Sequence, residues 1–164
     1  AVFESHVQSE IAAGASRDDA ELIASTYSAQ PGHSEHQLGT TSDVTFRTAN
    51  GNIFPGLGQE MWDAAAIQWV AANAHRFGIV MTYGRSKVGV TQYIWEPWHY
   101  RYVGVELANA MRACDLNTEE FLSYRYGVEP LPAYAGDELI LFEDARLVRH
   151  IDTLPGTWIA PETR

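Results

Sequence analysis

The sequence has a single cysteine, a single lysine and no long apolar run, and each scarcity excludes a class of protein. Cys114 has no second cysteine in the chain, so no intrachain disulfide framework holds the fold. No apolar stretch approaches the roughly 20 residues that a membrane-spanning helix needs. Lysine and arginine number 11 against 21 acidic residues, and Lys87 is the one lysine. Without a cationic cluster to release counterions, no nucleic-acid partner is expected.

The 164 residues are enough for one domain with a substantial core, and 46% of them are hydrophobic. This composition is typical of a globular protein and argues against disorder. The chain opens at Ala1 without a methionine and shows no signal peptide. Because such an opening fits a processed or excised segment, the missing targeting sequence indicates little. The oligomeric state is left open.

Apolar spacing and turn residues predict an α+β domain with a small, largely antiparallel sheet flanked by helices. Helices are predicted at residues 3–29 (two of them), 60–76, 105–114 and 118–124. Strands are predicted at residues 43–46, 78–83, 90–95, 99–103 and 138–142. Ser16 and Asp19 resemble a capping box before the second helix, and Asn117 is a candidate cap for the last one. The aromatic residues Trp62 and Trp69 share one side of the 60–76 helix, which predicts core packing.

Two stretches carry residues suited to chemistry: Pro31-Gly-His-Ser-Glu-His-Gln-Leu-Gly-Thr-Thr-Ser-Asp43 and Glu96-Pro-Trp-His-Tyr-Arg-Tyr-Val-Gly104. Two histidines and one aspartate are a sufficient protein set for a catalytic zinc, which keeps one position open for water. A carboxylate that does not ligate the metal can take a proton from that water. His36, Asp43 and His99 are therefore candidate ligands, and Glu96 is the candidate base.

Spacing alone does not bring these side chains together. His36 and Asp43 are seven residues apart, an odd offset that faces opposite sides of one strand, so Gly39 must turn the chain. Glu96 and His99 are three apart, again out of phase in a strand, and Pro97 biases Glu96 toward extended geometry. The segment therefore has to bend for both side chains to reach one cleft.

Two motifs together resemble the signature of the VanY-type D-alanyl-D-alanine carboxypeptidases, which are zinc peptidoglycan peptidases: Ser34-x-His36-x-x-Gly39-x-x-x-Asp43 and Glu96-Pro-Trp-His99. The resemblance covers roughly residues 1–114 and implies a catalytic core there, with residues 115–164 as a C-terminal extension packed on the same domain. It implies one zinc ion per chain in a cleft beside the sheet. The ligands would be His36, Asp43 and His99, and Glu96 would be the catalytic base.

The resemblance also implies a substrate site at Ser34, Gln37, Tyr83 and Trp98. Thr41 and Thr82 depart from the family, which usually has a small residue at the first position and often an arginine at the second. Members also carry a substrate-binding arginine in a Tyr-Arg-Ser segment upstream of the first helix, whereas this chain begins just after that point. Three explanations stay open: the chain is a fragment, its function is impaired, or another chain supplies the group.

The predicted activity is zinc-dependent hydrolysis near the C-terminus of peptidoglycan stem peptides, most simply D-Ala-D-Ala carboxypeptidase activity. A non-catalytic zinc-containing binding module of the same fold is the alternative. D,D-carboxypeptidase, L,D-carboxypeptidase, dipeptidase and endolysin activities share these metal residues, so the bond remains open. A location in the cell envelope or outside the cell follows from the substrate alone.

The remaining polar candidates are interpreted as structural. His6, His75 and His150 stand beside no other candidate ligand. Arg101 is predicted to make a structural ion pair, and Cys114 to be a buried thiol.

Overall fold

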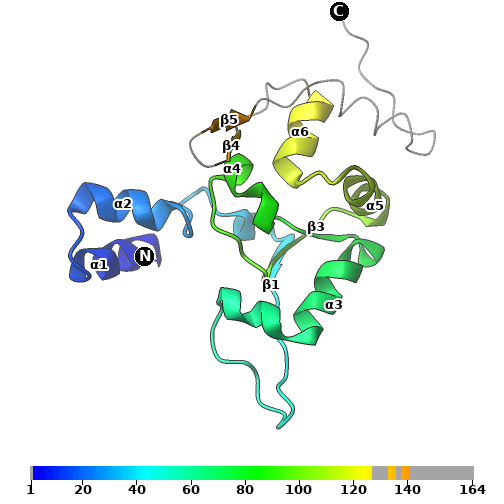
Figure 1. Ribbon diagram of the computed structural model, residues 1–164, viewed down its shortest axis with the longest axis horizontal. Coiled ribbons are helices and arrows are strands. Elements are labelled where there is room, and N and C mark those ends of the chain that lie inside the picture. The colour runs from blue at the N-terminus through cyan, green and yellow to red at the C-terminus, as the bar shows by residue number, and fades with distance from the viewer. Residues whose placement is uncertain (1, 127–132, 136–137, 141–164) are drawn as a thin grey trace, which may run out of the picture.

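A computed structural model describes residues 2–126, 133–135 and 138–140 (Figure 1). The helices are α1 (Val2–Ala12), α2 (Arg17–Ser25), α3 (Ala65–Asn73), α4 (Val88–Thr91), α5 (Val105–Cys114) and α6 (Thr118–Tyr126). Short 3-10 helices are η1 (Glu35–Leu38), η2 (Gln59–Asp63), η3 (Ala74–Phe77) and η4 (Arg85–Lys87). The strands are β1 (Thr41–Asp43), β2 (Ile79–Met81), β3 (His99–Tyr102), β4 (Ala133–Ala135) and β5 (Glu138–Ile140).

The first two helices form a hairpin beside the sheet-containing part of the molecule (Figure 1). Val7, Ala20 and Ala24 are fully buried between them. The Ser16 hydroxyl accepts a hydrogen bond from the backbone N–H of Asp19 at 3.2 Å, which starts α2. The predicted helical pair and its cap are confirmed, because apolar spacing and capping are local properties of the sequence.

A three-stranded antiparallel sheet in the order β1-β3-β2 lies at the centre of the fold. Strand β3 is the middle strand, so its residues are paired on both sides. Tyr100 pairs with Ser42 on β1 and Met81 on β2, and it is 2% exposed. The predicted α+β class with a small antiparallel sheet is thus confirmed, and every strand pair in the described residues is antiparallel.

The segment predicted as one helix over residues 60–76 is three pieces, η2, α3 and η3. Ala64 adopts an extended conformation with φ −79° and ψ 125°, which breaks the helix after Asp63. Because this break shifts the phase of the helical faces, Trp69 points outward and is 54% exposed. The prediction that Trp69 packs in the core is therefore wrong. Trp62 packs against Trp95 with ring centroids 5.3 Å apart.

The predicted strand at residues 90–95 is also wrong. Helix α4 occupies its start and ends at Thr91, and the next residue, Gln92, has a left-handed φ of 60°. The backbone N–H of Gln92 donates to Val88 O, and its side-chain amide donates to Gly89 O at 2.7 Å. Val90 and Trp95 are buried at the two ends of this segment, although its backbone forms no strand.

Helix α5 begins and ends as predicted, and α6 starts at a reciprocal cap. Asn117 Oδ1 accepts from the N–H of Glu120, and Glu120 Oε2 accepts from the N–H of Asn117, both at 2.8 Å. Cys114 is buried, as predicted. Only the first part of the 115–164 extension and the β4–β5 pair are described; the rest, including the end of the predicted 138–142 strand, lies outside the described residues. Within the described part, each helix is too short or too polar to cross a bilayer.

Candidate metal centre

The chain turns sharply between His36 and Asp43. His36 lies on η1, which Ser34 caps by accepting a hydrogen bond from the His36 N–H. The 3-10 helix ends at Gly39, whose φ of 70° lies in the left-handed region that glycine favours. Strand β1 then begins at Thr41 and places Asp43 at its end. The predicted turn at Gly39 is confirmed.

The second bend brings Glu96 and His99 to the same place. Pro97 and Trp98 form a turn in which the His99 N–H donates to Glu96 O at 3.2 Å. His99 is the first residue of β3 and the register partner of Asp43 on β1. The antiparallel pairing therefore places His99 beside Asp43, the last residue of the first motif.

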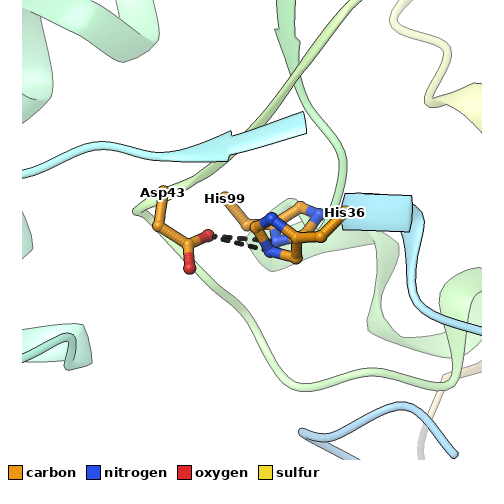
Figure 2. A group of neighbouring side chains, drawn as sticks. All are labelled: His36, Asp43 and His99. Carbon is orange, nitrogen blue, oxygen red and sulfur yellow. Dashed lines mark ion pairs between the residues drawn. The ribbon is translucent and has the colours of Figure 1, made fainter. Parts of the chain in front are cut away.

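The three predicted ligands converge. Figure 2 shows the Asp43 carboxylate directed at both imidazole rings. Asp43 Oδ1 lies 3.5 Å from His36 Nε2 and 3.3 Å from His99 Nδ1. One donor atom from each residue falls within 4.8 Å of the other two. His99 is 5% exposed at the base of the group, whereas the side chains of His36 and Asp43 are 44% and 30% exposed.

This donor set fits a catalytic zinc. Two imidazole nitrogens and a carboxylate oxygen are ligands that zinc prefers, and three protein ligands leave one position open. With ligand bonds of about 2.0–2.2 Å, the edges of a tetrahedral site measure roughly 3.3–3.5 Å. The two distances from Asp43 Oδ1 lie in that range. His36 and Asp43 are the more exposed members of the group, so an ion held there would be reached from the solvent side.

Glu96 is a buried carboxylate beside the candidate ligands. Its Oε2 lies 3.6 Å from His99 Nδ1, and its side chain is 7% exposed. Burial raises the pKa of Glu96 to about 7; the charge on His99 opposes this shift, and Asp43 adds to it. A general base works best with a pKa near the operating pH. The environment of Glu96 thus suits proton transfer.

Glu35 is a site residue that the sequence reasoning missed. Its carboxylate contacts His99 Nε2 at 3.1 Å and Arg101 Nη1 at 2.7 Å, and it accepts a hydrogen bond from the Thr82 hydroxyl at 3.0 Å. The predicted ion pair of Arg101 is thereby confirmed. The sequence held a usable signal for this contact. His99 and Arg101 are two residues apart on one strand, so their side chains share a face and one acidic residue can contact both. Thr82, a departure from the family pattern, is buried and completes this network.

These contacts also set the protonation of the pair. Burial alone would raise the pKa of Glu35, but hydrogen bonds with His99 and Thr82 and the charge of Arg101 hold it below its usual value. Burial would lower the pKa of His99, but hydrogen bonds with Asp43 and Glu35 and the charge of Glu96 raise it to about 9. Metal binding requires a neutral imidazole, so a cation competes with the proton here.

A cleft of about 670 Å³ opens over the three candidate ligands. All four predicted substrate residues line it: Ser34, Gln37, Tyr83 and Trp98. Tyr83 stacks on Tyr93 with centroids 4.5 Å apart and contacts the His99 ring. Among the described residues that line the cleft, none is a lysine or an arginine.

The other histidines lie apart from the ligands. His6 contributes to the cleft wall from α1 and packs edge-on against Tyr27, with ring centroids 5.1 Å apart. His75 lines a separate cavity of about 360 Å³ next to α5. Neither belongs to the group that could hold a metal ion, which agrees with their structural interpretation. His150 lies outside the described residues.

The family model for VanY, D-alanyl-D-alanine carboxypeptidase, matches residues 3–105. The D-alanyl-D-alanine carboxypeptidase of Enterococcus faecalis (strain ATCC 700802 / V583) is 37% identical over 112 residues, which are 68% of this chain and 38% of that protein. The Bacillus subtilis (strain 168) protein YodJ is 39% identical over 93 residues, which are 57% of this chain and 33% of that protein. The chain thus spans about a third of the length of these curated relatives.

Solved structures show the same fold. VanYB in complex with D-alanine-D-alanine superimposes with a TM-score of 0.61 at 34% identity, covering 74% of this chain and 62% of that one. A vancomycin-resistance D,D-pentapeptidase VanY mutant in complex with Zn(II) gives a TM-score of 0.60 at 34% identity, with the same two coverages. The family match covers more than half of the sequence and includes all three candidate ligands and Glu96. This chain therefore belongs to the VanY family of D-alanyl-D-alanine carboxypeptidases.

Proposed function

We propose that this chain binds one zinc ion through His36, Asp43 and His99 and hydrolyses a peptide bond near the C-terminus of peptidoglycan stem peptides. The observation that carries the proposal is the convergence of three donor atoms within 4.8 Å beside a buried glutamate. The Zn(II) complex of a VanY relative supports the choice of metal. The VanYB complex with D-alanine-D-alanine supports the choice of substrate class.

When bound, zinc supplies Lewis-acid chemistry that polarises a carbonyl and makes water more acidic. Glu96 then acts as general base: it accepts a proton from the attacking water and returns it to the leaving amine of the released D-amino acid. Its burial suits this exchange, because a carboxyl with a pKa of about 7 binds and releases protons readily near neutrality.

The cleft walls orient the peptide. Ser34 and Gln37 offer a hydroxyl and an amide to the peptide backbone, and both line the cleft beside the ligands. Tyr83 and Trp98 supply flat apolar walls that exclude water from the reacting bond. The substrate-binding arginine that members of the family carry upstream of the first helix has no counterpart among the described lining residues.

We also propose that the C-terminal extension, residues 115–164, packs on the same domain as the catalytic core. Lys87 contacts Glu120 Oε2 at 3.0 Å, which joins the start of α6 to η4. Glu120 is 4% exposed, so the ion pair is part of the packed structure. We place the protein's action in the cell envelope or outside the cell, because stem peptides of peptidoglycan are found there.

The test measures D-alanine released from a stem pentapeptide by the zinc-loaded protein. The parent should release D-alanine, and Glu96→Gln should lower the rate by about 10²–10⁴-fold with zinc content unchanged. Glu21→Gln is the matched control, because Glu21 is an exposed carboxylate paired with Arg17 on α2. Absence of release by the zinc-loaded parent, or equal rates for the parent and Glu96→Gln, refutes the proposal.

The bond that is cut is tested with the same protein. A stem tetrapeptide carries an L,D bond at its end, whereas the pentapeptide carries a D,D bond. D,D-carboxypeptidase activity predicts release from the pentapeptide only. An L,D-carboxypeptidase structure, LdcB, is also similar, with a TM-score of 0.58 at 30% identity, so the tetrapeptide is the informative comparison.

A binding module that holds zinc without turnover is the second candidate. It is favoured by the lack of lysine and arginine among the described cleft residues, because a substrate carboxylate has no cationic partner there. This candidate predicts saturable binding of the pentapeptide by the zinc-loaded protein with no D-alanine release. Release that depends on Glu96 excludes it.

A further inference from the structure

We propose that Glu35 is a positioning residue that selects which nitrogen of His99 binds the metal. The inference rests on the proposed zinc site and concerns a residue that does not itself ligate the ion. Glu35 reaches the ring of His99 from the side opposite Asp43, through the other nitrogen.

The two ring nitrogens of His99 face different groups. Nδ1 lies 3.3 Å from Asp43 Oδ1 and 3.6 Å from Glu96 Oε2, so it faces the other ligands and the base. Nε2 lies 3.1 Å from Glu35 Oε2, on the far edge of the ring. Only Nδ1 is in a position to share a cation with Asp43.

Glu35 dictates the tautomer of His99. An ionised carboxylate only accepts hydrogen bonds, so the contact with Glu35 places the ring proton on Nε2. A neutral imidazole carries one N–H, so Nδ1 then presents its lone pair to the metal. Carboxylates that hold a ligating histidine in this way fix the ring orientation and raise its basicity as a ligand.

Glu35 is itself held in place from two elements. Arg101 Nη1 lies 2.7 Å from Oε1, and the Thr82 hydroxyl donates to Oε2 at 3.0 Å. The Glu35 side chain is only 15% exposed. Because His99 and Arg101 lie two apart on β3, the strand aims both at the same carboxylate. The sheet thus fixes Glu35, and Glu35 fixes the ring.

The experiment measures the zinc dissociation constant by competition with a chromophoric chelator, together with the visible absorption spectrum of the Co²⁺-loaded protein. Glu35→Ala should weaken zinc binding by about 10–100-fold and alter the cobalt spectrum. Glu35→Gln should weaken it less, because an amide oxygen still accepts from Nε2–H, but without charge assistance. Glu21→Gln, which also removes a carboxylate paired with an arginine, should match the parent in both measurements.

The outcomes distinguish a failure of the proposed zinc site from a failure of the inference about Glu35. A parent chain that binds no zinc overturns the proposed function and this inference with it. A parent that binds zinc, while folded Glu35→Ala binds it equally tightly with an unchanged cobalt spectrum, overturns the inference alone. If Glu35→Ala does not fold, Glu35→Gln decides: zinc affinity equal to the parent overturns the inference, and an intermediate loss with an altered cobalt spectrum supports it.

Discussion

Asp43 and His99 are register partners across β1 and β3, and Asp43 Oδ1 lies 3.3 Å from His99 Nδ1. A three-residue strand thereby places one candidate ligand opposite another from 56 residues further along the chain. His36 joins them through the turn at Gly39. The site consequently depends on strand register, since a slip of one residue would turn Asp43 to the other face.

Asp43→Asn should abolish tight zinc binding. The substitution keeps the size of the side chain but removes the charge that faces both imidazoles at 3.3 and 3.5 Å. We expect zinc affinity to fall by more than about 100-fold, beyond the loss typical of a residue that only supports a ligand. Chelator competition measures the constant. Asp63→Asn, at an exposed position on η2, is the control, and equal affinities for the two variants would contradict the assignment.

Removal of the metal should lower the thermal stability of the parent chain. A ligand that binds only the folded state stabilises it by about 2.7 kcal/mol when present at 100 times its dissociation constant. We expect the melting temperature to fall when a chelator strips zinc and to recover when zinc is returned. The Asp43→Asn variant should show almost no zinc-dependent shift. If the melting temperature of the parent does not change with zinc, this result would contradict a zinc site assembled from three separate elements.

Gly78→Ala should destabilise the fold more than Gly51→Ala. Both glycines have left-handed backbones, with φ of 78° and 83°. A Cβ at Gly78 would lie 2.8 Å from the backbone of Gly104 and Val105, whereas one at Gly51 would meet nothing within 4 Å. We expect a loss of about 2–4 kcal/mol at Gly78, from overpacking added to backbone strain. Gly51→Ala should lose only about 1–2 kcal/mol. Urea unfolding measures both, and equal losses would contradict the close approach.

Asn117→Ala should weaken the start of α6. It removes the oxygen that accepts from the Glu120 N–H at 2.8 Å and leaves that donor buried. The expected loss is about 1–2 kcal/mol in the free energy of unfolding. Asn109→Ala is the control, since Asn109 is exposed and its amide donates to Val105 O within α5. It should change stability by less than about 0.5 kcal/mol. Similar losses for both variants would show that the cap contributes little.

Several features could be predicted because their causes are local. The caps at Ser16 and Asn117 act over three residues, and the turn at Gly39 follows from the offset between two candidate ligands. The three candidate ligands and Glu96 could be named from their motifs, and the structure brings the side chains of His36, Asp43 and His99 close together.

Other features could not be predicted because long-range packing decides them. The helical pattern at residues 60–76 gave no sign of the break at Ala64, so the exposure of Trp69 was missed. The β-branched and aromatic residues at 90–95 predicted a strand, whereas the backbone at Val90 is helical and the side chain is buried.

The sequence by itself determined the residue types that can hold zinc and move a proton, since those are properties of imidazole and carboxylate groups. Only the tertiary structure decided that Glu35 belongs with them. Its partners Thr82, His99 and Arg101 come from two neighbouring strand segments, 47 to 66 residues away. Contacts at that separation depend on sheet register and strand order, which are set by the packing of the whole domain and leave no periodic trace in the sequence.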